Sequence, residues 1–278
     1  MLTGKIVELH SDIMKFTLFK LASGKAMKLK SLCDKFLDPQ RKIRNSHVFK
    51  SIDSGVSAVF GWAGVSPPWK PDQREYWRSR NIGDTHGPES YLHEDNSIYV
   101  MFGDLLKALG GKASFLEIGC NAGRNLNYLV KRGYTDLAGI EINDASVNVV
   151  LKDYFPDLYE KGTFYIGNAL DEIKKIPDSR YDVVFSIAVL EHIPYEDRAL
   201  FTEMARVSKQ YIAIITGLKS TLFNHNYERI FRKLGFTAIV YRLFYGENNN
   251  FQLPTELYNK KHTFNSMFLR IFIKNSPS

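Results

Sequence analysis

The chain has 278 residues, of which 44% are hydrophobic and 24% charged, and its formal net charge is +7. These values are ordinary for a globular protein with one large domain and an appendage. With only two cysteines, Cys33 and Cys120, the composition excludes a disulfide framework or a cysteine-based metal site. No early apolar run is long enough for a signal segment or a membrane span, so we expect a cytoplasmic protein.

The positive charge is concentrated near the start of the chain. Residues 15–50 contain ten Lys and Arg against two Asp, an excess of eight, so all other residues together carry −1. Within this segment, apolar residues recur at helical spacing: Leu29, Leu32, Cys33, Phe36 and Leu37. The pattern predicts either a surface helix with a solvated lysine face or a segment, residues 13–50, that contacts an anionic membrane surface or an acidic partner.

Residues 53–97 are rich in Gly, Pro, Trp and Tyr and hold all three tryptophans. Such frequent breakers predict loops and short elements. The aromatic side chains have two interpretations: they line a ligand pocket, or they anchor an irregular segment by packing.

Residues 114–143 predict a buried strand, a glycine turn, a helix and a second buried strand that ends in Glu141. Gly119 and Gly123 let the backbone approach a ligand, and Glu141 can accept hydrogen bonds from both ribose hydroxyls. The spacing excludes a dinucleotide fingerprint, because Asn121 and Arg124 stand where its later glycines belong. A phosphate-binding Gly-Lys-Ser/Thr ending is also absent.

Strands and helices alternate through the rest of the chain, which predicts a parallel, doubly wound α/β sheet. The predicted strands cover residues 115–119, 137–142, 163–166, 181–187 and 210–216, and the predicted helices 123–132, 144–153, 170–175 and 196–208. A helix at 226–235, strands at 237–244 and 268–273, and a polar connection at 245–265 complete the chain.

Several ordered motifs resemble class I S-adenosylmethionine-dependent methyltransferases over about residues 110–240. They are Glu117-x-Gly119-x-x-x-Gly123, the acid Glu141, the triplet Gly167-Asn168-Ala169 and the run from Tyr181 to Pro194. The resemblance implies a Rossmann-like, seven-stranded, mostly parallel sheet with an antiparallel end. It also implies a methyltransferase domain at residues 101–278, preceded by a basic extension and cap at residues 1–100, with Tyr76 to Tyr99 in the place of the cap.

The resemblance also assigns the cofactor, S-adenosylmethionine. The glycine turn, Glu117, Asn121 and Asn125 would surround its methionine part, and Glu141 would hold the ribose. Asn168 stands where related enzymes usually have an acid that faces the adenine, and its side-chain carbonyl can still accept from the adenine amino group. The full predicted cofactor set is Glu117, Gly119, Asn121, Gly123, Asn125, Glu141, Ile142, Asn168, Ala169, Ser186 and Ala188.

The segment after the fourth predicted strand bears on the methyl acceptor. Ile187-Ala188-Val189-Leu190 differs from the Asp/Asn-Pro-Pro-Tyr/Phe of amino-methylating DNA enzymes, and no cysteine is placed for cytosine-C5 chemistry. Leu190 to Pro194 resembles small-molecule and sugar methyltransferases instead. His192 and Glu191 are the candidate catalytic residues, either as a general base or as structural residues. No cluster has metal-ligand spacing, so no metal is expected.

Three functions remain open. The first is methyl transfer to an oxygen, or as the less favoured alternative a nitrogen, of a small molecule such as a sugar or glycan precursor. A softer resemblance to bacterial surface-glycan enzymes and the basic segment, which suits an acidic nucleotide sugar or lipid-linked saccharide, favour it. The second is an RNA or protein methyltransferase that docks through residues 15–50, although these lack the aromatic residues of a stacking platform. The third is a non-catalytic protein with a cofactor fold.

Overall fold

The computed structural model describes residues 61, 64–67, 70–94, 96–109, 111–217, 222–223, 225–245 and 266–276. The predicted basic segment at residues 13–50 and nearly all of the polar connection at 245–265 therefore lie outside the described residues. Contacts divide the chain into two units. The first is Met1–Pro71 with Pro194–Glu196 and Thr221–Asn224, and the second, Asp72–Ile193 with Asp197–Ser220 and His225–Ser278, contains the whole sheet. The predicted domain boundary near residue 100 stays a prediction.

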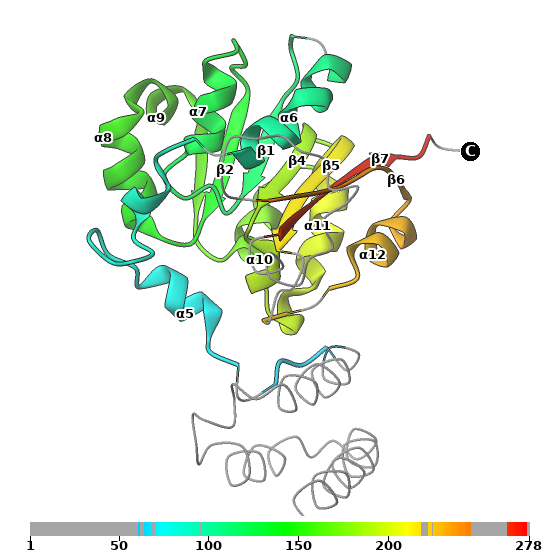
Figure 1. Cartoon of the computed structure of the whole chain (residues 1–278), viewed down its shortest axis with the longest axis horizontal. Helices are drawn as coiled ribbons and strands as arrows, with labels where there is room; N and C mark the ends of the chain where they lie inside the picture. Colours follow the sequence, from blue (N-terminus) through cyan, green and yellow to red (C-terminus); the bar gives the residue numbers. More distant parts are fainter. Residues whose placement is uncertain are drawn as a thin grey trace, which may run out of the picture. The chain divides into compact units, whose positions relative to one another are not determined.

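Seven strands in the described part of the chain form one sheet in the order β3-β2-β1-β4-β5-β7-β6 (Figure 1). Strand β7 runs antiparallel to β5 and β6 on either side of it. The strands are β1 (Phe115–Ile118), β2 (Leu137–Glu141), β3 (Thr163–Ile166), β4 (Tyr181–Ile187), β5 (Ser208–Gly217), β6 (Phe236–Tyr245) and β7 (Ser266–Lys274). The predicted doubly wound, mostly parallel sheet with an antiparallel end is confirmed.

Among the described residues, three helices precede β1, and the others lie between the strands that follow. In chain order they are α5 (Gln73–Arg78), η1 (Pro88–Tyr91), α6 (Asn96–Leu109), α7 (Arg124–Val130), η2 (Ser146–Leu151), α8 (Lys152–Tyr154), α9 (Pro156–Lys161), α10 (Ala169–Glu172), η3 (Ile173–Lys175), η4 (Leu190–His192), η5 (Tyr195–Asp197), α11 (Ala199–Val207) and α12 (Tyr227–Lys233).

Both faces of the sheet are covered by helices, which is why the central strands β1 and β2 are buried at every position. In β1, Phe115 packs into a core with α6, α7 and α9, whereas Leu116 and Ile118 pack into a second core with α10, α11 and α12 (Figure 1). The parallel strands β1 to β5 therefore bring their carboxyl ends to one edge, where open α/β sheets bind ligands.

Two features of the helices differ from the sequence prediction. The predicted helix at 144–153 begins with a π-helical stretch, η2, before the short α-helix α8. Helix α6 was not predicted, although Ile98, Met101, Phe102 and Leu105 have the i, i+3, i+4, i+7 spacing of a buried helical face. The breakers before residue 97 masked this periodicity.

None of the helices in the described ranges is long and apolar enough to cross a membrane.

The contact between β2 and the glycine turn yields a stability prediction. A Cβ on Gly139 would lie 2.5 Å from the Cys120 Sγ, whereas a Cβ on Gly103, in α6, meets nothing within 4 Å. We expect Gly139→Ala to lower the free energy of unfolding by about 1–3 kcal/mol through overpacking, measured by urea denaturation.

Gly103→Ala is the control and should be neutral or raise stability by up to about 1 kcal/mol, because alanine favours the helix. Adding Cys120→Ala to Gly139→Ala should recover part of the loss. The steric cause would be ruled out if the double variant lost as much unfolding free energy as the two single variants lose in total.

Candidate active site

The loop between β1 and α7 is built around two glycines in the left-handed region of backbone conformation. Gly119 has a φ of 74° and Gly123 a φ of 76°. A Cβ at Gly119 would lie 2.5 Å from a methyl of Val189, and a Cβ at Gly123 would lie 2.5 Å from one of Leu151. Both positions therefore require glycine for conformation and for packing. Asn121 between them also has positive φ, at 47°.

Glu117 is fully buried at the end of β1, on the face covered by α7. Its Oε1 accepts a hydrogen bond from the Asn125 Nδ2 at 2.5 Å, and its Oε2 has no partner among the described residues. Burial raises the pKa of this carboxyl to about 8, and the nearby Glu141 adds to the rise. A buried acid with one unpartnered oxygen fits the cationic amino group at the methionine end of the cofactor.

Glu141 ends β2 and is also buried. Its Oε2 accepts the Asn121 N–H at 2.8 Å, and its Oε1 accepts the Asn143 N–H at 2.9 Å. Burial raises its pKa despite these hydrogen bonds, which act in the opposite direction. Each oxygen keeps a further lone pair, so the carboxyl group can still accept from a ribose diol.

Asn143 joins this strand end to the end of α5 and the residues after it, a role that the sequence analysis missed. Its Nδ2 donates to the carbonyl oxygens of Arg80, at 2.7 Å, and Trp77, at 3.3 Å, while its Oδ1 accepts the Ala145 N–H at 3.0 Å. The end of α5 is thus held at the carboxyl end of β2. The available signal was a short amide side chain two residues after the strand-end acid.

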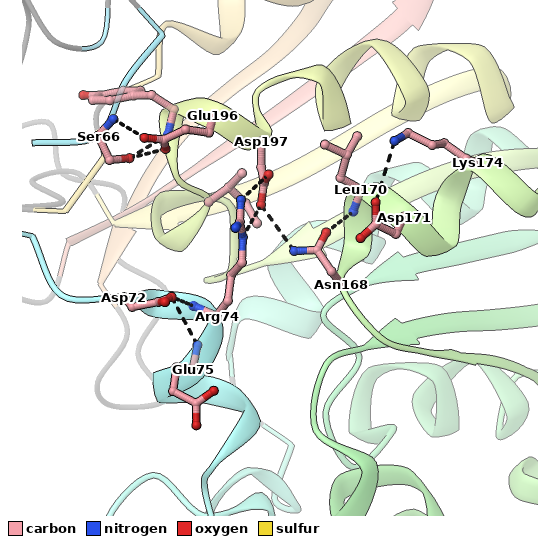
Figure 2. Close-up of polar contacts among 12 residues, drawn as sticks. Ser66, Asp72, Arg74, Glu75, Asn168, Leu170, Asp171, Lys174, Glu196 and Asp197 are labelled. Carbon is pink, nitrogen blue, oxygen red and sulfur yellow. Dashed lines mark hydrogen bonds and ion pairs between the residues drawn. The ribbon is translucent and has the colours of Figure 1, made fainter. Parts of the chain in front are cut away.

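Asn168 caps helix α10, since its Oδ1 accepts the Leu170 N–H at 2.9 Å. Its Nδ2 donates to the Asp197 Oδ2 at 3.3 Å (Figure 2). Ala169 begins the helix, and both Ala169 and Ile142 are half-buried. The amide of Asn168 is therefore oriented by a residue outside the predicted site.

Ser186 and Ala188 hold the ends of the central strands. The fully buried Ser186 Oγ donates to the Ile118 carbonyl oxygen at 2.9 Å, between β4 and β1. Ala188, at a φ of 56°, donates its N–H to the Ile215 carbonyl oxygen at 2.8 Å. Their contact with cofactor stays a prediction.

Glu191 and His192 lie side by side after β4 in different environments. The Glu191 Oε1 accepts the Gly217 N–H at 3.0 Å, which ties the end of β4 to the end of β5. Burial raises its pKa, and its Oε2 has no partner among the described residues.

His192 contacts helix α5. Its Nδ1 lies 2.9 Å from the Gln73 Oε1, and its ring packs edge-on against Trp77 with a centroid distance of 5.1 Å. Burial, followed by the neighbouring His86, lowers its pKa to about 4. The sequence analysis missed Gln73, which lies 119 positions away in the chain.

No group of three or more His, Cys, Asp or Glu side chains in the described part of the chain is arranged to hold a metal ion.

The pKa of Glu117 leads to a prediction about the ligand-free protein. A carboxyl whose folded-state pKa is raised stabilises the fold fully below its unfolded value of 4.5, and this contribution is lost as pH rises to about 8. Glu117→Gln removes the titration. The free energy of unfolding of Glu117→Gln, minus that of the unmodified protein, should therefore increase with pH in this window. The expected slope is up to ~1.4 kcal/mol per pH unit, measured by urea denaturation.

Glu160→Gln, a change at an exposed residue of α9, should leave the pH dependence as it is. Equal pH dependence in Glu117→Gln and the unmodified protein would show that Glu117 does not titrate in this range.

Comparisons with known proteins bear on the domain type and on the fold. Residues 116–213 match the model of a methyltransferase domain. A search among curated proteins gave no significant match.

Three solved structures show the same fold at low identity. A chain from the complex of the Haloferax volcanii Trm112 methyltransferase activator with a methyltransferase is 13% identical, with a TM-score of 0.53, covering 74% of this chain and 99% of that one. Magnesium protoporphyrin IX methyltransferase from Synechocystis, solved with bound S-adenosylmethionine, is 14% identical, with a TM-score of 0.52 and coverage of 74% and 98%. An RNA methyltransferase from Pyrococcus horikoshii is 15% identical, with a TM-score of 0.51 and coverage of 73% and 97%.

At these identities the three structures support the fold alone, and residues 116–213 match a methyltransferase domain. The glycine turn and the buried acids Glu117 and Glu141 fall inside or directly beside the matched core. The protein therefore carries a class I, S-adenosylmethionine-dependent methyltransferase domain.

Proposed function

We propose that this methyltransferase acts on an oxygen of a small molecule, a sugar or glycan precursor. The observation that carries the proposal is the contact between His192 and Gln73, at the edge of the sheet where ligands bind. Since the Gln73 Oε1 faces Nδ1, the imidazole carries its proton there. The Nε2 then keeps a lone pair that can accept the proton of an acceptor hydroxyl.

The environment of His192 supports a neutral base. A pKa of about 4 keeps the imidazole uncharged near neutral pH, so the lone pair is available. Bound S-adenosylmethionine supplies an electrophilic methyl group on a cationic sulfur. When the neutral imidazole accepts the hydroxyl proton, it becomes positively charged. The same step removes the positive charge of the sulfonium, so the net charge of the site does not change. This balance offsets part of the cost of charging a buried histidine.

Trp77 supports a hydroxyl-bearing acceptor. Its indole N–H is buried and has no partner among the described residues, an arrangement that costs about 1–3 kcal/mol. An acceptor oxygen bound beside His192 would give this donor a partner. A sugar offers several such oxygens and an apolar ring face that can pack on an aromatic side chain.

Cofactor binding gives the first test, because Glu141 is proposed to hold the ribose. Glu141→Ala removes two acceptors and detaches the backbone at Asn121, so we expect S-adenosylmethionine affinity to fall about tenfold or more. Isothermal titration calorimetry measures the change, with Glu160→Gln as a matched surface control. Unchanged affinity would refute the ribose role.

The acceptor is identified by transfer of label. We expect labelled S-adenosylmethionine to deliver its methyl group to a pool of nucleotide sugars or lipid-linked saccharides. RNA, protein and small-metabolite pools should stay unlabelled. Label in RNA alone would overturn the sugar proposal in favour of docking through the basic segment.

With the labelled acceptor in hand, His192→Ala should lower kcat by roughly a hundredfold or more while the cofactor Kd is kept. His93→Ala, at an exposed histidine, is the control. Gln73→Glu should raise the pKa of His192, because a carboxylate at Nδ1 favours the imidazolium form. The acidic limb of the kcat/KM profile should then move to higher pH. An unmoved profile would mean that His192 is structural.

A further inference from the structure

Asp197 joins three separate segments at the adenine side of the predicted cofactor site. It lies at the end of η5, in the same unit as the sheet, and is 8% exposed. Its carboxylate accepts two hydrogen bonds from Arg74 of α5, from Nε at 2.8 Å and from Nη2 at 2.5 Å, and a third from the Asn168 Nδ2 at 3.3 Å (Figure 2).

These contacts fix which way the Asn168 amide faces. A carboxylate only accepts hydrogen bonds, so the nitrogen of the amide must point toward Asp197. The oxygen then faces the Leu170 N–H, which it accepts at 2.9 Å. Turning the amide over would place its oxygen against the carboxylate and lose both interactions.

An oriented amide still has one lone pair on its oxygen and one hydrogen on its nitrogen. They form an acceptor beside a donor when Asp197 takes the hydrogen that points away from the amide oxygen. Adenine presents the complementary pair, an amino donor next to a ring-nitrogen acceptor, and asparagine pairs with adenine in this two-point manner elsewhere. A carboxylate at position 168 could accept from the amino group only.

We propose that Asp197 is a positioning residue for cofactor recognition: it orients the Asn168 amide so that the amide reads both the amino group and the adjoining ring nitrogen of adenine. Related enzymes usually carry an acid at position 168 that contacts adenine directly. Here the acid is Asp197, which would act on adenine only through the Asn168 side chain. Arg74 neutralises this acid and couples it to α5.

A second acid at position 168 would then be harmful. In Asn168→Asp, two carboxylates would face each other across the 3.3 Å contact in a partly buried place, although aspartate caps α10 as well as asparagine does. Exchanging both residues, in Asn168→Asp with Asp197→Asn, restores one donor facing one carboxylate.

The test is calorimetric binding of two ligands to the full-length protein. The first is S-adenosylhomocysteine, and the second is S-inosylhomocysteine, in which an exocyclic carbonyl oxygen replaces the amino group and the adjoining ring nitrogen carries a hydrogen. We expect Asn168→Asp to weaken S-adenosylhomocysteine binding about tenfold. The exchanged double variant should recover part of that loss, because it removes the repulsion but leaves a carboxylate that cannot donate to the ring nitrogen.

The variant Asp197→Asn distinguishes two roles of Asp197: orienting the Asn168 amide, and only anchoring α5 through Arg74. Once the amide can turn over, it can pair with either base, so the preference for the adenine ligand should fall about tenfold relative to the unmodified protein. Arg74→Gln should keep that preference. Asp171→Asn, the same chemical change at an exposed residue of α10, should alter neither affinity.

Equal weakening of both ligands in Asp197→Asn, matched by Arg74→Gln, would overturn the proposal, because Asp197 would then only anchor the cap. An exchanged double variant that binds as weakly as Asn168→Asp would also overturn it. Thermal melting of each variant establishes that the binding data refer to folded protein.

Discussion

The carboxylate of Glu141 is the interaction on which the cofactor end of the molecule depends. One oxygen holds the glycine turn through Asn121, and the other holds the chain after β2 through Asn143. Asn143 in turn binds two carbonyl oxygens at the end of α5. A single buried acid therefore connects the central strands, the cofactor loop and the cap. Burying a charge is costly unless it is hydrogen-bonded. The two backbone N–H donors therefore make it possible for Glu141 to be buried at this position.

Helix α5 has only six residues, too few to be stable on its own, and polar contacts to three strand ends hold it. Asn143 binds its end, Gln73 reaches His192 after β4, and Arg74 reaches Asp197 beside the loop after β3. The same contacts orient the side chains that we propose to act on the cofactor and the acceptor. One set of polar contacts both anchors α5 and orients the side chains of the site. A substitution in α5 should therefore affect both.

Burial changes the chemistry of three ionisable groups along this edge. It raises the pKa values of Glu117 and Glu141 and lowers that of His192, so each group is driven toward its neutral form. The donor is cationic at its sulfur and amino group. A bound cation favours ionised acids, which couples cofactor binding to the protonation state of the site.

The sequence by itself determined the sheet, because short continuous apolar runs in the strands and their alternation with helices are local signals. All seven strands lie where they were predicted, and the methyltransferase resemblance rests on residues within a continuous stretch. Local patterns also placed Glu117, Gly119, Gly123 and Glu141 in one turn-and-strand unit. Only the tertiary structure decided that Gln73 meets His192, that Asn143 holds α5, and that Asp197 faces Asn168. The residues of these pairs are separated by up to 119 positions in the chain. They meet only because parallel strands end at a common edge of the sheet. No periodicity or spacing rule in the sequence relates such side chains.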